Sequence, residues 1–324
     1  MSEIRSNSLI KLEKLENVGV GDLKPLQLAP TELEKLENVG KGQLKPLQLN
    51  CKWQTGGEVT RIIALANQKG GTGKTTSAIN IAAGLARGVS NGKRVLLVDA
   101  DPQANATATF LGVPFAAGPQ ERPTIYEVLM GKAEAAQVIC TVELPRRGPV
   151  PAASLDVLPA HLNLAAAELE LVAEFQRESR LRDALAPLLD NYHFVIIDCP
   201  PSLGLLTLNA LMAAGEVIIP TEPGYFPLIG IGLLQRTIDK VRRVNPSLRI
   251  SGVLPTMSVG TSLARQTRQA LSEQFNSLVL PSIPRRVSIA EAVAAGKDIF
   301  GYEPLTHDGA AAYATVVKEI MQRG

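Results

Sequence analysis

Short apolar runs alternate with longer amphipathic stretches from residue 61 to the end of the chain. The apolar runs are unbroken, which is typical of strands buried on both faces of a parallel sheet, and the longer stretches carry apolar residues at helical spacing. The alternation predicts an α/β fold with a doubly wound, mostly parallel sheet that helices cover on both faces. The predicted strands are 61–66, 94–100, 194–198, 216–220, 249–255 and 278–284, and the predicted helices are 75–87, 164–189, 205–214, 230–244, 262–275, 289–295 and 309–322. Two stretches between them, Ala116–Pro123 and Leu144–Ala153, are expected to be surface excursions, either a sheet edge or disordered.

The first 57 residues lack this alternation and carry a duplication instead. Residues 12–28 read LEKLENVGVGDLKPLQL and residues 33–49 read LEKLENVGKGQLKPLQL, so the copies start 21 residues apart. Each copy predicts a helix of about three turns or fewer followed by an extended arm, and such a helix is marginal alone in water. Two hypotheses stay open: residues 1–57 form a flexible solvated tail, or they form a tandem docking motif whose two copies add avidity for a further partner. Residues 58–324 are predicted to form a domain of their own.

The composition narrows the class of protein. With 324 residues, of which 45% are hydrophobic and 20% charged, the chain is expected to be globular and neither collagenous nor mostly disordered. Its three cysteines, Cys51, Cys140 and Cys199, lie far apart and form no CxxC pair, which favours a reducing compartment over a disulfide framework or a cysteine metal site. The chain has no run of about 18 apolar residues and no apolar segment at its start, so we expect a cytoplasmic protein without a membrane span or a secretion signal.

The segment KGGTGKTT, residues 69–76, lies between the first predicted strand and the first predicted helix. Its glycines allow the backbone to curl so that successive N–H groups point inward, and the helix that follows presents its positive end to a phosphate. Lys74 is placed to reach the β- and γ-phosphates of ATP, and the Thr75 hydroxyl is placed to ligate Mg²⁺. The standard phosphate-binding loop has glycine where this chain has Gln68, so the loop is a variant. The predicted cofactor-binding residues of this loop are Lys69, Gly70, Gly71, Thr72, Gly73, Lys74, Thr75 and Thr76.

Three aspartates follow predicted strands. Asp99 and Asp101 end the second strand in VDADPQANAT, and Asp198 ends the third in FVIIDCPPS. The carboxyl ends of parallel strands meet at one edge of a sheet, where carboxylates beside a phosphate-binding loop can hold Mg²⁺. The sequence therefore predicts a metal site made by Thr75 and carboxylates among these three aspartates.

These motifs resemble those of the ParA/Soj family, within the deviant Walker A (ParA/MinD) group of ATPases. Lys69 opens KGGTGKTT in the manner of the deviant Walker A motif. The segment VDADPQANAT resembles the family's VDxDPQGNAT and departs from it at Ala104, which stands in place of glycine. The segment IIDCPPSLGLLTLNAL resembles its Walker B motif and the following helix, and residues 283–320 resemble its C-terminal region. The resemblance covers almost all of residues 61–324 and leaves the repeats outside.

The resemblance implies a deviant-Walker P-loop ATPase fold and a weak ATPase that forms a homodimer with ATP, in which two protomers enclose two nucleotides. It assigns Lys69 to the phosphates of the opposite subunit, where a second cation would offset transition-state charge. It assigns to Asp101 the orientation of the attacking water, and to Asp99 and Asp198 metal contacts through water. The residues expected to contact the base are Met257, Pro284 and Arg285.

Basic residues are concentrated between positions 236 and 286. This stretch has nine Lys or Arg and two acidic residues, a balance of +7, whereas the whole chain has +2 and the remainder therefore −5. Such a cluster favours a surface for DNA phosphates, and without a recognition-helix motif the contact should be independent of DNA sequence. The resemblance agrees, since it implies nonspecific DNA binding in the ATP state, association with the nucleoid, and stimulation by a ParB/Spo0J-like partner. The candidate DNA-binding residues are Arg242, Arg243, Arg265 and Arg268.

Two functions stay open at this point. The first is partitioning of a chromosome or plasmid together with the ParB-like partner. The second uses the same ATPase to position a protein cargo that the N-terminal repeats recruit. Membrane cycling of the MinD type is disfavoured, because that group ends with a basic amphipathic helix whereas this chain ends VKEIMQRG. A binding module without hydrolysis is disfavoured by the presence of Lys69 and Asp101.

Overall fold

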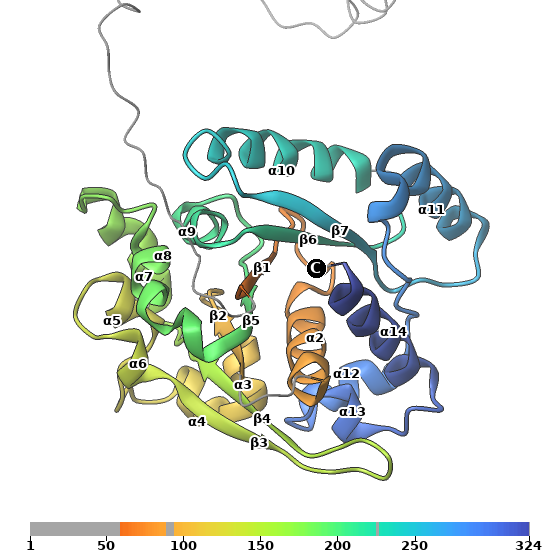
Figure 1. Ribbon diagram of the computed structural model, residues 1–324, viewed down its shortest axis with the longest axis horizontal. Coiled ribbons are helices and arrows are strands. Elements are labelled where there is room, and N and C mark those ends of the chain that lie inside the picture. The colour runs from red at the N-terminus through yellow and green to blue at the C-terminus, as the bar shows by residue number, and fades with distance from the viewer. Residues whose placement is uncertain (1–58, 89–93, 225–226, 324) are drawn as a thin grey trace, which may run out of the picture. The chain divides into compact units, whose positions relative to one another are not determined.

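The computed structural model describes residues 59–88, 94–224 and 227–323, which hold a seven-stranded sheet flanked by helices (Figure 1). The strands are β1 (Arg61–Leu65), β2 (Arg94–Asp99), β3 (Cys140–Leu144), β4 (Ala153–Leu158), β5 (Tyr192–Asp198), β6 (Glu216–Thr221) and β7 (Arg249–Pro255). Their order is β3-β4-β2-β5-β1-β6-β7, and each neighbouring pair is parallel except β3 and β4, which form an antiparallel hairpin at one edge. The stretch Leu144–Ala153 connects these two strands, so the expected surface excursion belongs to a sheet edge. The predicted doubly wound, mostly parallel α/β fold is confirmed.

The helices divide between the two faces of this sheet. They are α2 (Lys74–Gly88), α3 (Asn105–Leu111), α4 (Val113–Ala117), α5 (Ile125–Leu129), α6 (Ala135–Val138), α7 (Leu164–Glu170), α8 (Arg180–Leu185), α9 (Leu205–Ala213), α10 (Pro227–Val241), α11 (Ser262–Phe275), α12 (Val287–Ala294), α13 (Ile299–Tyr302) and α14 (Asp308–Gln322). Ile63 and Leu65 of β1 pack toward α2 and α14, and Ala64 between them packs toward α9 and α10 (Figure 1). All three are fully buried, and each large aliphatic side chain buried in this way stabilises the fold by about 1.5–3 kcal/mol.

Close packing around α2 depends on a glycine in the middle of the helix. A Cβ atom on Gly84 would lie 2.6 Å from the Val317 side chain and 2.9 Å from the Phe300 ring, closer than real Cβ contacts. Glycine therefore lets α13 and α14 approach α2. This packing fixes the helix whose first turn adjoins the predicted phosphate-binding loop.

Two predicted elements are wrong. The single helix predicted for 164–189 is divided into α7, α8 and short 3₁₀ segments, because the chain turns at Gln176, whose φ is +53°. The strand predicted for 278–284 makes only isolated bridges, because Pro281 and Pro284 have no N–H group to donate to a ladder.

The N-terminal repeats lie outside the described residues. The division of the chain into 1–57 and 58–324, and both hypotheses for the repeats, therefore stay predictions. In the part of the chain that the structure describes, no helix combines the length and the apolar character needed to cross a membrane.

Candidate nucleotide-binding site

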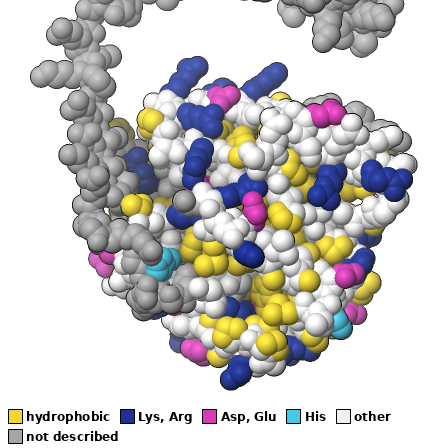
Figure 2. Space-filling view, turned by 45° about the vertical axis from the view of Figure 1, so that its right-hand side comes forward, with side chains coloured by type: hydrophobic (Ala, Val, Ile, Leu, Met, Phe, Trp, Pro, Cys, Tyr) yellow, Lys and Arg dark blue, Asp and Glu magenta, His cyan; other side chains and the backbone are white. Residues whose placement is uncertain are grey.

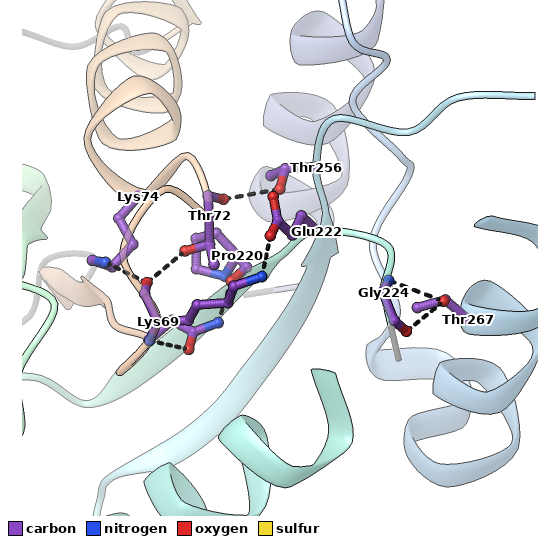
Figure 3. A network of polar contacts seen from close by, with 9 residues as sticks. Lys69, Thr72, Lys74, Pro220, Glu222, Gly224, Thr256 and Thr267 are labelled. Atoms are coloured by element: carbon purple, nitrogen blue, oxygen red, sulfur yellow. Dashed lines mark hydrogen bonds and ion pairs between the residues drawn. The ribbon is translucent and has the colours of Figure 1, made fainter. Parts of the chain in front are cut away.

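The phosphate-binding loop joins β1 to α2 at the carboxyl edge of the sheet (Figure 3). Gly71 and Gly73 have φ angles of +74° and +76°, a conformation that favours glycine, so the curl of the loop depends on both. Thr256, directly after β7, donates a hydrogen bond of 2.9 Å from its hydroxyl to the Thr72 carbonyl. The loop is thus held from β1, from α2 and from the segment that follows β7.

Lys74 is buried at the centre of this loop. The residue is 6% exposed, and its Nζ donates a hydrogen bond of 3.1 Å to the Lys69 carbonyl. Burial lowers the pKa of Lys74, and the negative charges of Asp198 and Asp101 oppose that shift. A buried ammonium with a single neutral acceptor and nearby acids is well placed to exchange that acceptor for phosphate oxygens.

The acidic pair, Asp99 and Asp198, stands at the ends of neighbouring strands. The two residues are register partners on β2 and β5, and both are fully buried. Asp99 accepts hydrogen bonds from the Asp101 N–H and from the N–H and hydroxyl of Thr107, and burial nevertheless raises its pKa to about 6. Among the described residues neither oxygen of Asp198 has a hydrogen-bond partner, and burial, together with the charge of Asp99, raises the pKa of Asp198 well above its ordinary value.

A magnesium ion fits beside the acidic pair. The Thr75 hydroxyl lies near enough to Asp198 to lower its pKa, without hydrogen-bond geometry, so two predicted metal ligands lie together. Within the described ranges no group of three His, Cys, Asp or Glu side chains could hold a metal alone. Mg²⁺ normally combines one or two protein oxygens with water and substrate phosphates. The unpartnered buried carboxylate and the hydroxyl therefore suit Mg²⁺ that arrives with a nucleotide.

Asp101 begins a tightly turned loop between β2 and α3. It is 7% exposed, and its Oδ1 accepts a hydrogen bond of 2.9 Å from the Gln103 N–H. Its carbonyl accepts another of 2.9 Å from the Ala104 N–H. Ala104 is buried in the left-handed region, with φ 51° and ψ 32°, at the position where the ParA/Soj motif has glycine. The turn holds Asp101 near Lys74 and the acidic pair, whose pKa values its charge influences.

Lys69 differs from Lys74 in its exposure. Its backbone is fixed, since its N–H donates to Asn67 Oδ1 at 3.0 Å and Asn67 in turn donates to the Pro220 carbonyl at 2.7 Å. Its side chain is 61% exposed and forms an ion pair with Glu222, which follows β6 (Figure 3). The predicted trans-acting lysine is thus mostly exposed, its backbone N–H is hydrogen-bonded, and its ammonium pairs with an acid of its own chain.

The residues expected near the base lie on two adjoining loops. The Ser258 N–H donates to the Ile283 carbonyl at 2.9 Å, and the Arg285 N–H donates to the Ser258 carbonyl at 3.0 Å. Met257, with φ 50° and 37% exposure, and Pro284 belong to these same loops. The structure brings the three candidates together, next to the segment that holds the phosphate loop, and contact with a base stays a prediction.

The arginines predicted to bind DNA occupy two places. Arg265 and Arg268 are exposed and lie three residues apart on α11. Arg242 and Arg243 follow the end of α10. The pattern predicted a helix up to residue 244, so the expectation that these two arginines lie within a helix is wrong. Arg242 is already engaged, since it pairs with Asp239 at 3.2 Å and donates to a backbone carbonyl at 2.8 Å. Figure 2 shows Lys and Arg side chains gathered along the upper part of this face, where α10 lies.

Sequence reasoning missed three residues of the site: Thr107, Glu222 and Thr256. Glu222 and Thr256 directly follow β6 and β7, so their position at the carboxyl edge of the sheet was the available signal. Thr107 lies in α3, a helix whose NATATFL sequence has no clear apolar periodicity.

Several known proteins are similar to this chain in sequence or in fold. A family model described as an AAA domain matches residues 60–250. The chromosome partitioning protein ParA of Caulobacter vibrioides is 42% identical over 268 residues, which are 81% of this chain and 94% of that protein. The sporulation initiation inhibitor protein Soj of Bacillus subtilis is 43% identical over 269 residues, 82% of this chain and 99% of that protein.

One solved structure of similar fold contains a bound nucleotide and a metal ion. Cobyrinic acid a,c-diamide synthase from Mycobacterium smegmatis, with bound ADP and magnesium, has a TM-score of 0.66 and 35% identity over 81% of this chain and 94% of that one. Its name and those of the partitioning relatives describe different activities, so shared fold alone does not select between them. The ParA and Soj relatives are the more similar in sequence, at 42% and 43% identity against 35%. The chain therefore belongs to the ParA/Soj family of partitioning ATPases.

Proposed function

We propose that this chain is an ATPase that dimerises when it binds MgATP, binds DNA without sequence preference, and partitions a chromosome or plasmid with a ParB-like partner. The observation that carries the proposal is the difference between its two lysines. Lys74 is buried beside Asp198, whereas Lys69 points outward on a fixed backbone. One chain can thus supply a cation to its own nucleotide and offer another to a second copy.

The chain's own groups bind and orient the nucleotide. Loop N–H groups from Gly70 to Thr76 and the positive end of α2 bind the phosphates. Lys74 exchanges the Lys69 carbonyl for a phosphate oxygen. The Thr75 hydroxyl and the acidic pair would hold Mg²⁺. Bound Mg²⁺ supplies charge neutralisation at the phosphates.

Hydrolysis in this proposal needs two further side chains. Asp101 accepts a hydrogen bond from the attacking water and orients it toward the γ-phosphate. Lys69 of a second copy offsets the negative charge of the transition state. Turnover is slow in the isolated chain because the lysine that offsets this charge comes from a second copy, and a ParB-like partner stimulates hydrolysis once the dimer has formed.

DNA binding follows from dimerisation, because two copies bring two basic surfaces together. Arg243, Arg265 and Arg268 are the exposed candidates without an acidic partner among the described residues. Phosphate contacts of this kind release counterions, so affinity falls steeply as salt rises. Such binding would place a cytoplasmic protein on the nucleoid.

The experiment compares DNA binding with ATP and with ADP at several salt concentrations. Wild type is expected to bind only with ATP, with equal affinity for unrelated sequences. Arg265→Glu/Arg268→Glu should abolish binding and keep ATP-dependent dimers, whereas the exposed pair Lys132→Glu/Arg146→Glu on other elements should bind as wild type does. Wild type that binds no DNA with ATP would contradict the proposal.

Positioning of a protein cargo is the second candidate, and the duplication of residues 12–28 at 33–49 favours it. Removal of residues 1–57 should leave ATPase activity unchanged, because the site residues all lie beyond residue 60. If the repeats recruit a cargo, deletion of one copy should weaken cargo binding less than deletion of both. Equal cargo binding by the full chain and the double deletion would exclude this candidate.

A further inference from the structure

Thr107 is the buried centre of a hydrogen-bond network beside the loop that begins at Asp101. It is fully buried near the start of α3. Its N–H and its hydroxyl donate to the same oxygen, Asp99 Oδ2, at 2.8 Å and 2.7 Å. The hydroxyl also accepts a hydrogen bond of 2.8 Å from the Ala160 N–H, which follows β4. One threonine therefore joins the ends of β2 and β4 to α3.

The same carboxylate also holds the other end of the loop. Asp99 Oδ1 accepts a hydrogen bond of 3.2 Å from the Asp101 N–H. Asp99 thus fixes residue 101 with one oxygen and residue 107 with the other. Between them Ala104 takes a left-handed conformation that is unfavourable for a residue with a Cβ atom. A loop with such a turn keeps its shape only when its surroundings hold both ends.

We infer that Asp99 and Thr107 are positioning residues that hold the loop of Asp101 in the conformation required for hydrolysis. The inference rests on the proposed hydrolytic function, in which Asp101 orients the attacking water. Orientation of a nucleophile tolerates little displacement, and a shift of about 1 Å can lower a rate by about 100-fold. Asp99 therefore acts on the reaction through the backbone of Asp101, in addition to any contact with the metal.

Thr107→Val tests the inference, because valine keeps the shape of threonine and removes the hydroxyl. With MgATP, kcat should fall by about 10-fold or more while the affinity for ATP stays within about twofold. Thr107→Ser restores the hydroxyl and should recover kcat to within about threefold of wild type. The matched control is Thr109→Val on the same helix, since the buried Thr109 hydroxyl donates only to the Asn105 carbonyl of its own helix.

Amide hydrogen exchange without nucleotide gives a readout that is independent of hydrolysis. In Thr107→Val the Asp101 amide, at the opposite end of the loop, should exchange at least about 10-fold faster than in wild type, whereas Thr109→Val should leave it unchanged. Should Thr107→Val not fold, Thr107→Cys, whose thiol is a weak donor, serves the same comparison.

Two outcomes would overturn the inference. The first is wild-type kcat in Thr107→Val. The second is an equal loss in Thr107→Val and Thr109→Val, which would make Thr107 a residue of general stability. Absence of ATP hydrolysis in the wild type would instead contradict the proposed function, so the two failures are distinguishable.

Discussion

The two sides of the nucleotide site differ in how completely one chain builds them. On the inner side the charged groups are at most 7% exposed: Lys74, Asp99, Asp101 and Asp198. On the outer side the Lys69 side chain is 61% exposed and Met257 is 37% exposed. The inner side thus brings a lysine and three carboxylates together within one chain, and we expect it to bind phosphates and metal. The outer side leaves Lys69 mostly exposed, with an acid of its own chain as its partner, and we propose that a second molecule completes this side.

Burial explains why the two sides respond differently to mutation. A charge inside the protein depends on its partners, because water cannot replace them, so a change on the inner side should have a large effect. An exposed ion pair such as that of Lys69 and Glu222 contributes little, because water screens it.

Loss of the buried lysine should have the largest effect. Lys74→Ala removes the ammonium at the centre of the loop, and we expect the affinity for ATP to fall by more than about 100-fold. Isothermal titration calorimetry measures this, with the exposed Lys318→Ala as the control. Unchanged affinity in Lys74→Ala would refute the assignment of the loop.

Loss of the Asp101 carboxylate should separate binding from hydrolysis. Asp101→Ala is expected to bind ATP and to dimerise as wild type does, while kcat falls by about 100-fold or more, because the aspartate orients water and does not hold phosphate. A phosphate-release assay and a binding titration on the same preparation measure both quantities. A parallel loss of affinity and kcat would assign Asp101 to phosphate binding.

Asp198→Asn should stabilise the metal-free protein and inactivate it. Both aspartates of the acidic pair hold a proton more tightly in the folded chain than in the unfolded one, where their pKa is about 4. Their charged forms therefore destabilise the fold, and the free energy of unfolding should fall as pH rises from about 4 through 6. Asp198→Asn should flatten that slope and raise the Tm at pH 7 by about 3 °C or more.

Thermal unfolding between pH 4 and 8 without Mg²⁺ measures this effect, with the exposed Asp190→Asn as the control. Mg²⁺-dependent ATP hydrolysis should be lost in Asp198→Asn and retained in the control Asp190→Asn. A lower Tm for Asp198→Asn than for wild type at pH 7 would mean that the carboxylate has a stabilising partner and is not held ready for a cation.

Loss of Glu222 should have the smallest effect. Glu222→Gln releases Lys69 from its partner within the chain, so the ATP-dependent dimer should become tighter, by about fivefold at most, since exposed ion pairs contribute up to about 1 kcal/mol. Sedimentation equilibrium with ATP measures the dissociation constant. A weaker dimer would show that Glu222 serves the interface instead.

Motif and periodicity predicted the centre of this molecule better than its edges. The unbroken apolar strands and KGGTGKTT predicted the central strands, the helix α2 and the placement of Lys74 and Asp198 at strand ends, because burial on both faces and phosphate binding each demand particular residue types. The helix predicted for 164–189 was wrong, since its composition does not reveal the turn at Gln176. The roles of Thr107 and Glu222 depend on contacts between distant segments, which no local pattern records.

The central claim is that the outward lysine completes the site of a second copy. Sedimentation velocity with ATP tests it in the hydrolysis-deficient Asp101→Ala protein, which keeps the nucleotide intact, with and without Lys69→Ala. Asp101→Ala should sediment as a dimer with ATP and as a monomer with ADP. Asp101→Ala/Lys69→Ala should still bind ATP through Lys74. It should nevertheless remain a monomer at protein concentrations at least about 10-fold above those at which Asp101→Ala dimerises. A double mutant that binds ATP and dimerises as readily as Asp101→Ala would contradict the account.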